Sequence, residues 1–483
     1  MDKSLRQKAI TGVAWTAFNK FGTMIISFVS NIILARLLMP DDFGTIGIMM
    51  VFVSFANIFV DGGFSMSLIQ KKEANQNDFS SVFYLNLLMS VLLYILLFVS
   101  APIIDSFFSG KAITSMLRVI GLILIFNAFS IIQISRLSIS LKFREITVYN
   151  LIATSVGVIV AIVMALDNYG VWSLVYKTII TGLILSLILW IRSGWRPARQ
   201  FSIKSVKGLY RFGGFMFLST FVEVLYAEIQ PIIIGKFFSL GQLGYYTQAR
   251  KIQEIPANGM VSVINTVAFP IYSKLQDQKE KLAQGIRKSL MAMSYVIIPL
   301  MILLIILAKP VVLFLLGDKW EEAYPLLQIL SIAGIFRIAS GNNMNAIQSI
   351  GKGKAFFYIQ LAKRGVGLFR IIIGSFFGIM GLMWGFALAS FLFWAIDSSF
   401  CGKYIGYSFI EQLKNLFPII LLSTLVGVAV YFLGTYVGGG NLFKILFQGV
   451  VYATIYISTS LTLKMEGAML YMDIYYKRKK RHI

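Results

Sequence analysis

The sequence contains the run Arg36-Leu-Leu-Met-Pro-Asp-Asp-Phe-Gly44, and 200 residues later it contains the similar run Lys236-Phe-Phe-Ser-Leu-Gly-Gln-Leu-Gly244. A second pair of similar runs follows in the same order, namely Ala101-Pro-Ile-Ile-Asp-Ser-Phe-Phe-Ser-Gly110 and Lys309-Pro-Val-Val-Leu-Phe-Leu-Leu-Gly317. Two correspondences in one order indicate an internal duplication, which many membrane transporters share. The runs therefore predict a duplicated membrane protein and favour transport as its function.

The amino-acid composition agrees with this interpretation. The chain has 483 residues, of which 57% are hydrophobic, against about 45 to 50% in ordinary soluble domains. Its formal net charge of +23 would suggest nucleic acid as the partner of a soluble protein, but in a membrane protein basic loops set the orientation. We therefore expect a polytopic membrane protein that does not bind nucleic acid.

The sequence offers little for metal or covalent chemistry. Its one cysteine, Cys401, cannot form an internal disulfide, and its one histidine, His482, excludes histidine-based metal sites and Ser-His-Asp catalysis. A G-x-x-x-x-G-K-S/T phosphate loop does not occur in the sequence, and the connections between its apolar stretches are too short for a catalytic domain. We therefore expect no enzyme, no cofactor and no bound metal, with an ion or substrate gradient as the energy source.

The apolar stretches predict an all-α fold of fourteen transmembrane helices, because a spanning helix needs about 20 mostly apolar residues. Six spans precede residue 200, six follow it, and a further pair ends the series. They lie near residues 12–38, 43–69, 80–107, 112–135, 146–166, 169–191, 212–235, 244–272, 289–316, 323–349, 355–376, 378–400, 415–436 and 442–463.

Lysine and arginine are distributed unevenly between alternate loops. One side of the predicted membrane carries only Arg36, Lys111, Lys236, Lys319 and Lys444, so the positive-inside rule places both termini in the cytoplasm. Both halves then start on that side, and the two six-helix repeats run parallel. The expected domains are an N-terminal six-helix lobe (1–200), a C-terminal six-helix lobe (201–402), an extra helix pair (403–466) and a basic cytoplasmic tail (467–483).

Four phrases carry a family resemblance. They are Leu37-Leu-Met-Pro-Asp-Asp-Phe-Gly44, Asp61-Gly-Gly-Phe-Ser-Met-Ser-Leu-Ile-Gln-Lys71, Leu243-Gly-Tyr-Tyr-Thr-Gln-Ala-Arg-Lys-Ile-Gln-Glu-Ile-Pro256 and Phe314-Leu-Leu-Gly-Asp-Lys-Trp320. In these phrases, and over the whole chain, the sequence resembles the polysaccharide transport family of the multidrug/oligosaccharidyl-lipid/polysaccharide exporter superfamily, which includes Wzx-type flippases.

The resemblance implies two lobes that form a V-shaped cleft with alternating access. The implied substrate is an oligosaccharide or polysaccharide repeat unit on an undecaprenyl pyrophosphate carrier, moved across the bacterial cytoplasmic (inner) membrane. Membrane lipid, a polysaccharide polymerase and export machinery are the implied partners. For the last helix pair the resemblance implies a groove for the polyprenyl tail, and the alternative is that the pair only packs against the lobe or mediates association.

Polar and ionisable side chains recur at helical spacing within several spans, where lipid exposure would be costly and functional roles are common. We expect the basic ones to bind pyrophosphate by charge-assisted hydrogen bonds; they are Lys20, Arg250, Arg337, Lys363, Arg364 and Arg370. We expect neutral polar ones to exchange hydrogen bonds with sugar hydroxyls; they are Asn31, Asn57, Gln230, Asn345, Gln348 and Gln360.

Acidic residues in the spans are candidates for binding a coupling proton or sodium ion, because protonation and charge partners compete in a low-dielectric site. These are Asp61, Glu223, Glu228 and Asp397. Two alternatives remain open. Asp61 and Asp397 either take this role, or cap local breaks in the helices or pair with a neighbouring cation. Arg250 either binds cargo or pairs with Glu254 four residues later.

A cation-coupled multidrug efflux antiporter of the same superfamily is the alternative function. Organic cations favour a cavity of acids and aromatic rings. The predicted cavity has at least as many basic candidates as acidic ones, which favours an anionic, lipid-linked cargo.

Overall fold

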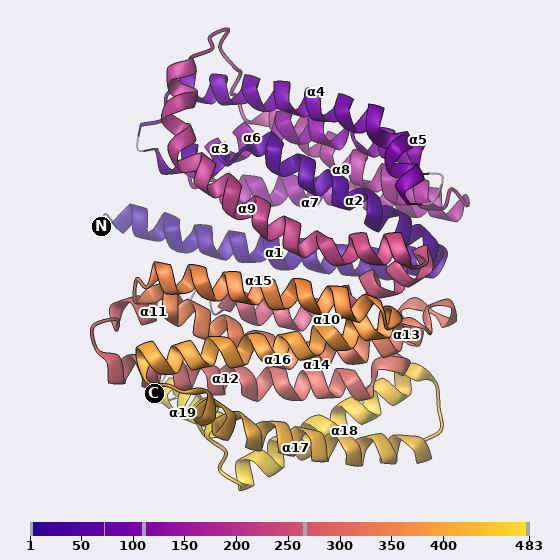
Figure 1. Ribbon diagram of the computed structural model, residues 1–483, viewed down its shortest axis with the longest axis vertical. Helices are drawn as coiled ribbons and strands as arrows, with labels where there is room; N and C mark the ends of the chain where they lie inside the picture. Colours follow the sequence, from indigo (N-terminus) through magenta and orange to yellow (C-terminus); the bar gives the residue numbers. More distant parts are fainter. Residues whose placement is uncertain (1–2, 72, 109–112, 264–267, 480–483) are drawn as a thin grey trace. The chain divides into compact units, whose positions relative to one another are not determined.

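A computed structural model of the chain describes residues 3–71, 73–108, 113–263 and 268–479. Every element in these ranges is a helix (Figure 1), so the expected all-α class is confirmed. The elements are α1 (Lys3–Leu37), α2 (Pro40–Asp61), α3 (Phe64–Gln70), α4 (Gln76–Phe107), α5 (Thr114–Ile120), α6 (Ile123–Ile139), α7 (Phe143–Leu166), α8 (Val171–Arg192), α9 (Ile203–Phe237), α10 (Leu240–Val263), α11 (Phe269–Lys274), α12 (Lys279–Ile306), α13 (Ala308–Leu316), the short 3-10 helix η2 (Asp318–Trp320), α14 (Ala323–Ser349), α15 (Gly353–Ser375), α16 (Gly378–Ile405), α17 (Phe409–Tyr436), α18 (Asn441–Thr462) and α19 (Glu466–Lys479).

Within the described residues, each predicted span coincides with one helix or with two successive helices. Residue 112 and residues 264–267, which belong to two of the predicted spans, lie outside the described residues. Within the described residues, eleven helical segments are long and apolar enough to cross a membrane, and Phe21–Leu37 in α1 forms a shorter apolar helix. α10 and α15 are not among the eleven, because charged residues such as Glu254 and Lys363 interrupt their apolar stretches. By length and composition, the chain is a multi-pass membrane protein.

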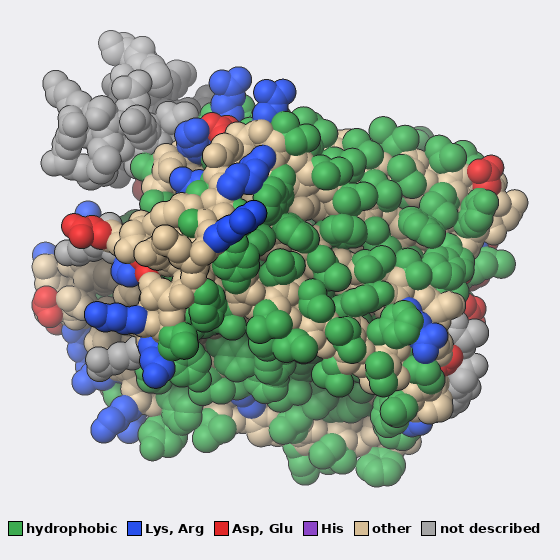
Figure 2. Space-filling view, turned by 90° about the horizontal axis from the view of Figure 1, so that it is seen from above, with side chains coloured by type: hydrophobic (Ala, Val, Ile, Leu, Met, Phe, Trp, Pro, Cys, Tyr) green, Lys and Arg blue, Asp and Glu red, His purple; other side chains and the backbone are tan. Residues whose placement is uncertain are grey.

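The outer surface fits this description. α4 presents an exposed apolar face that includes Leu88, Leu92, Ile95, Val99 and Ile103. Figure 2 shows one face of the molecule that is largely apolar, with most of its Lys and Arg side chains gathered at one end. An apolar band with charged side chains at its end is what a bilayer with polar surfaces requires.

The chain divides into two compact units, Met1–Gly244 and Tyr245–Ile483. Within the first unit α1 packs on α7, α7 on α8, and α6 on both α4 and α8. α9 also belongs to this unit, because it packs on α2, α3 and α4. The division lies after Gly244, within the first turns of α10, whereas the repeat in the sequence placed α9 at the start of the second lobe.

The two duplicated runs meet where α2 and α10 begin. A Cβ atom on Gly44 would lie 1.9 Å from the carbonyl oxygen of Leu240, and a Cβ atom on Gly244 would lie 2.0 Å from the carbonyl oxygen of Pro40. Any side chain at either position would therefore overlap the backbone of the other helix. This reciprocal contact is a physical reason for a glycine at the end of both runs.

The second unit is built around α12, α14 and α16. α14 packs on both of the others, α15 packs on α16, and α17 packs on α12 and α18. Trp394 of α16 is fully buried and stacks on Phe336 of α14. Asn343, Asp397 and Gln412 are also fully buried. Because polar groups in a membrane-embedded bundle need partners, these three buried polar residues mark the candidate site.

Candidate functional site

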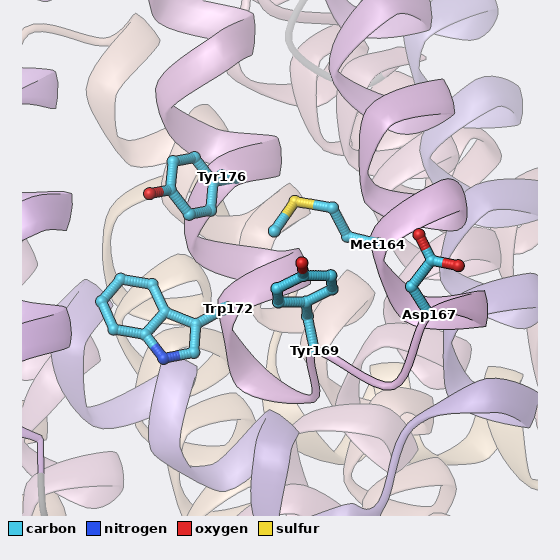
Figure 3. A pocket seen from close by; sticks show the side chains of 5 residues that line it. All are labelled: Met164, Asp167, Tyr169, Trp172 and Tyr176. Carbon is cyan, nitrogen blue, oxygen red and sulfur yellow. The ribbon is translucent and has the colours of Figure 1, made fainter.

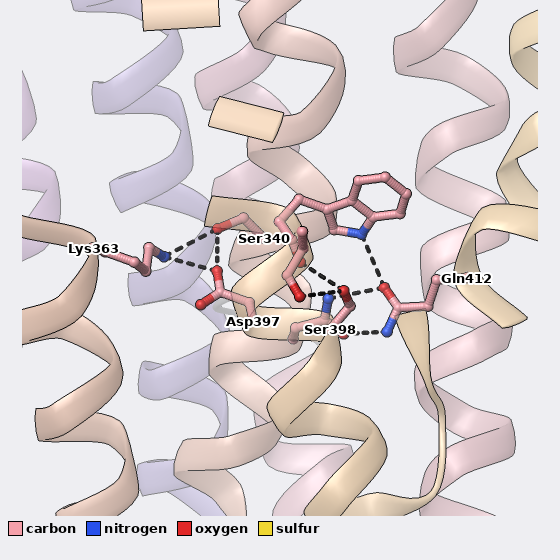
Figure 4. Close-up of polar contacts among 8 residues, drawn as sticks. Ser340, Lys363, Asp397, Ser398 and Gln412 are labelled. Carbon is pink, nitrogen blue, oxygen red and sulfur yellow. Dashed lines mark hydrogen bonds and ion pairs between the residues drawn. The ribbon is translucent and has the colours of Figure 1, made fainter. Parts of the chain in front are cut away.

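Lys363 of α15 and Asp397 of α16 form an ion pair inside the second unit (Figure 4). Lys363 Nζ lies 2.7 Å from Asp397 Oδ2 and donates to Ser340 Oγ of α14 at 3.2 Å. The Ser340 hydroxyl donates to the same carboxylate oxygen. The Lys363 side chain is 12% exposed and that of Asp397 is fully buried. A predicted cargo-binding cation and a predicted coupling acid are therefore partners, which is the pairing alternative for Asp397.

A second polar network joins α14, α16 and α17 beside this ion pair (Figure 4). The Gln412 amide nitrogen donates to Asn343 Oδ1 at 2.9 Å and to the Tyr407 carbonyl at 3.2 Å, and its oxygen accepts from Asn343 Nδ2 and Trp394 Nε1 at 2.9 and 3.0 Å. The amide thus uses all its hydrogen-bonding capacity, which fixes α17 on the α14–α16 pair.

Sequence reasoning missed Gln412 because it lies before the span predicted near 415–436. A local signal was present. Ser408 and Glu411 form a capping box, in which each side chain bonds the backbone N–H of the other residue. This motif marks the start of a helix, and it places Gln412 in the first turn of α17.

α10 and α14 contribute a cluster of two arginines around one glutamate. Arg250 Nε donates to Glu254 Oε1 at 2.8 Å, and Arg337 Nη1 lies 3.8 Å from the same oxygen. The side chains of Arg250 and Arg337 are 37% and 43% exposed. The structure thus confirms the intrahelical pair that the spacing allowed. One carboxylate balances two guanidinium groups, so the cluster retains positive charge and spare donors for an anion.

In the first unit, Asp61 lines a cavity of about 230 Å³ together with Asn57, Phe217 and Thr220. The Asp61 carboxylate accepts from the Ser65 hydroxyl and from the Ser65 backbone N–H at 3.3 Å. Asn57 Oδ1 accepts from Asn127 Nδ2 at 2.9 Å. Two predicted site residues, Asn57 and Asp61, therefore share one small cavity between α2 and α9, whose lining also includes apolar side chains.

The acidic and amide candidates on α9 differ in burial. Glu223 is exposed, Glu228 is half-buried and Gln230 is 3% exposed. α9 packs on α2, α3 and α4 of the first unit. These three side chains therefore share a helix with Thr220 of the Asp61 cavity, but they have different surroundings.

The remaining predicted site residues are distributed over three helices. Arg370 of α15 places its guanidinium carbon 4.7 Å from the ring centre of Phe386 on α16. Arg364 and Gln360 on α15, Asn345 on α14 and Asn31 on α1 are half-buried, and Gln348 on α14 is exposed. Lys20 lies in α1, and its side chain is outside the described part of the structure.

An aromatic pocket at the turn between α7 and α8 was not predicted. Its volume is about 510 Å³, and Figure 3 shows its lining side chains Met164, Asp167, Tyr169, Trp172 and Tyr176. The i,i+4 spacing of Trp172 and Tyr176 next to a predicted loop was the available signal. Tryptophan and tyrosine near span ends are typical of a membrane interface, and we assign the pocket no further role.

Comparison with known proteins identifies similar sequences. A family model described as "Polysaccharide biosynthesis protein" matches residues 33–325. The succinoglycan biosynthesis transport protein ExoT of Rhizobium meliloti is 26% identical over 75% of this chain and 74% of its own length. The teichuronic acid biosynthesis protein TuaB of Bacillus subtilis is 25% identical over 89% of both chains. The lipopolysaccharide biosynthesis protein WzxC of Escherichia coli is 23% identical over 90% of this chain and 89% of its own.

Solved structures share the fold. The lipid II flippase MurJ in an inward closed conformation superposes with a TM-score of 0.75 at 17% identity, covering 94% of this chain and 99% of MurJ. An inward-facing multidrug resistance transporter of the MATE family reaches a TM-score of 0.58 at 16% identity, covering 84% of this chain and 98% of its own. At these identities the likeness establishes the fold alone.

Proposed function

The chain belongs to the polysaccharide biosynthesis protein family, and from this premise we propose that it is a flippase for a repeat unit of an oligosaccharide or polysaccharide linked to undecaprenyl pyrophosphate. It moves this lipid-linked unit across the bacterial inner membrane by alternating access. The observation that carries the proposal is the similarity, over most of the chain, to proteins named for the synthesis or transport of bacterial polysaccharides. The fold shared with a lipid II flippase supports it.

The charges in the second unit support an anionic cargo. A pyrophosphate carries negative charge that hydrocarbon cannot solvate, so its passage needs fixed positive partners. The cluster of Arg250, Glu254 and Arg337 supplies two guanidinium groups to one carboxylate, and both arginines are partly exposed. Because arginine binds phosphate bidentately, we assign the pyrophosphate to these two side chains.

α17, the first helix of the last pair, provides part of a surface for a hydrocarbon tail. A cavity of about 490 Å³ lies between α12, α14 and α17, and its lining includes Ile302, Ile305, Ile332, Ile420 and Phe432. Isoleucine and phenylalanine side chains gain free energy by covering an alkyl chain, about 25 cal/mol for each Å² removed from water. This supports the groove for the polyprenyl tail over simple packing of the last helix pair.

Fourteen spans complete the proposal. They form two parallel six-helix repeats and a terminal pair, with both termini in the cytoplasm. Coupling to a proton or sodium ion is assigned to Asp61, Glu223 and Glu228, of which Asp61 lines a small cavity with Asn57 and Thr220. Asp397 is instead paired with Lys363.

The test is an accumulation assay. The gene is deleted, and lipid extracts of the cytoplasmic leaflet are analysed by mass spectrometry for undecaprenyl-linked oligosaccharides. We expect one such oligosaccharide to build up and to disappear when the wild-type gene is restored. If no lipid-linked sugar accumulates while sensitivity to cationic drugs rises, the chain is a multidrug antiporter, a function that the fold shared with the MATE transporter also permits.

A further inference from the structure

The carboxylate of Asp397 uses its two oxygens unequally. Oδ2 accepts from Lys363 Nζ and from the Ser340 hydroxyl. Oδ1 is buried and has no hydrogen-bond partner among the described residues. A buried carboxylate oxygen without a partner is costly, and in native proteins it points to an unseen ligand or a change of state. Oδ1 of Asp397 is therefore able to accept a further ligand while Oδ2 is bonded to Lys363 and Ser340.

The positive charge of Lys363 neutralises the negative charge of Asp397. α16 packs on α12, α14, α15 and α17, and the basic groups within the described part of those helices include Arg287, Arg337, Arg364, Arg370 and Lys414. Among described residues, the basic side chain within ion-pair distance of Asp397 is Lys363. If its ammonium group left, Asp397 would keep a buried charge with only the Ser340 hydroxyl beside it.

The Lys363 ammonium group stands where a small cation would stand. It contacts one carboxylate oxygen at 2.7 Å and one hydroxyl oxygen at 3.2 Å, and oxygens of these two kinds are ligands that hard cations prefer. Its side chain is long, flexible and 12% exposed. Lysine can therefore withdraw from Asp397 without moving a helix.

We propose that Lys363 and a small monovalent cation such as Na⁺ are alternative partners of Asp397. With Lys363 in place, the site needs no ion. When the ammonium group turns to an anionic ligand, Na⁺ takes its position between Asp397 and Ser340. The anion rests on the proposed function, in which it is the pyrophosphate of the cargo, but the cation site does not depend on that identity.

This exchange couples two ligands. A cation that binds Asp397 releases Lys363 for the anion, and an anion that holds Lys363 opens the cation site, so each ligand strengthens the binding of the other by the same factor. The anion and the cation then bind together, and one side chain links them.

The first experiment uses the full-length protein in detergent without any anion ligand. Thermal unfolding is followed in NaCl and in N-methyl-D-glucamine chloride at equal ionic strength. In Lys363→Met, we expect the melting temperature to be low in N-methyl-D-glucamine and to rise with Na⁺ until it saturates, because an ion that binds only the folded state stabilises it. The sodium response must exceed that of the wild type and must vanish in the double variant Lys363→Met/Asp397→Asn.

Lys177→Met is the matched control. Lys177, like Lys363, is a half-buried lysine, but its Nζ donates to the Ser30 hydroxyl at 2.8 Å, so its loss exposes no carboxylate and should create no extra sodium response. Lys363→Gln is a second variant in case the methionine variant does not fold. Equal melting of the Lys363 variants in both salts overturns the proposal. A response to pH but not to Na⁺ also overturns it, because the site would then bind a proton.

The second experiment uses the wild-type protein and inorganic pyrophosphate. We expect the pyrophosphate concentration at half-maximal stabilisation to be lower in Na⁺ than in N-methyl-D-glucamine by about fivefold or more, and this difference to disappear in Asp397→Asn. Pyrophosphate stabilisation that is identical in both salts contradicts the exchange. A complete lack of pyrophosphate binding counts against the anionic cargo of the proposed function, and the first experiment then decides the cation site by itself.

Discussion

Gly44 and Gly244 form a reciprocal contact in which each lies on the backbone of the residue four positions before the other. Gly44 faces the carbonyl of Leu240, and Gly244 faces the carbonyl of Pro40, with room for a hydrogen atom but not for a methyl group. The contact joins the starts of α2 and α10. The two similar runs of sequence are therefore in direct contact, and their final glycines allow the two helices to pack closely.

Alanine at either glycine should therefore destabilise the protein. Gly44→Ala or Gly244→Ala places a methyl group against backbone that cannot rotate away, and overpacking of this kind costs about 1 to 3 kcal/mol or more. The measurement is thermal unfolding in detergent. Gly208→Ala in α9 is the control, because a Cβ atom there meets nothing within 4 Å. If Gly44→Ala melts at the temperature of Gly208→Ala, the close contact is not real.

Arg337→Gln should reduce export while leaving the fold intact. The guanidinium is 43% exposed and 3.8 Å from Glu254, so its loss should cost less than about 1 kcal/mol of stability. A charge-assisted hydrogen bond to phosphate contributes about 1.5 to 3 kcal/mol, so export should fall about tenfold or more. The measurement is surface polysaccharide in a complemented deletion strain, with the melting temperature of the purified variant.

Lys309→Gln is the matched control for that change. Lys309 is 53% exposed and also pairs with a glutamate, Glu321, at 2.7 Å, but it lies outside the Arg250, Glu254 and Arg337 cluster. We expect normal export from it. Equal export by the Arg337 and Lys309 variants would remove Arg337 from the cargo site.

Gln412→Leu should lower stability strongly. It leaves the Asn343 amide and the Trp394 N–H without their partners in a fully buried setting, and each unsatisfied group costs about 1 to 3 kcal/mol. Unfolding in detergent should shift by several degrees. Gln276→Leu, at an exposed position, should change stability by no more than about 0.5 kcal/mol. An unshifted Gln412 variant would mean that the network does not hold α17 in place.

Neutralising Asp61, Glu223 and Glu228 together should weaken the coupling of export to the ion gradient. Carboxylates that bind a proton or sodium ion lose that capacity as amides, so export should fall, and ionophores should reduce what remains less than they reduce export by the wild type, in which these carboxylates act beside Asp397. The measurement is polysaccharide export with and without ionophore. Asp167→Asn, in the aromatic pocket of α7 and α8, is the control. Export that stays normal and ionophore-sensitive in the triple variant would contradict ion coupling by these residues.

Helix positions could be predicted from the sequence because a bilayer demands long apolar runs. Contacts within one helix could be predicted as well, since Arg250 and Glu254 lie one turn apart and meet at 2.8 Å. The pairing of Lys363 with Asp397 could not be derived, because it depends on how α15 and α16 are rotated against each other. The sequence therefore led to two separate roles, cargo binding for Lys363 and ion coupling for Asp397, although these two side chains form one ion pair.

The packing of α9 shows a second limit. Duplication assigned this helix to the second half, yet it packs on α2, α3 and α4. A Cβ atom on Gly63 would lie 2.2 Å from the carbonyl oxygen of Gly213 on α9, and Ser67 donates to the Leu209 carbonyl at 3.0 Å. Contacts that involve backbone atoms do not require apolar residues at regular spacing. The packing of α9 on the first unit could therefore not be predicted from the sequence.

The pairing of α15 with α16 also bears on how the protein is made. α15 carries Lys363, Arg364 and Arg370, and a charged residue at the centre of a helix opposes insertion into a membrane by about 2.5 to 3.5 kcal/mol. α16 follows after a very short turn, and it brings Asp397 to Lys363 and the Phe386 ring to Arg370. We therefore expect the ribosome-bound chain to release α15 into lipid only once α16 has emerged, so that the two helices are inserted as one hairpin.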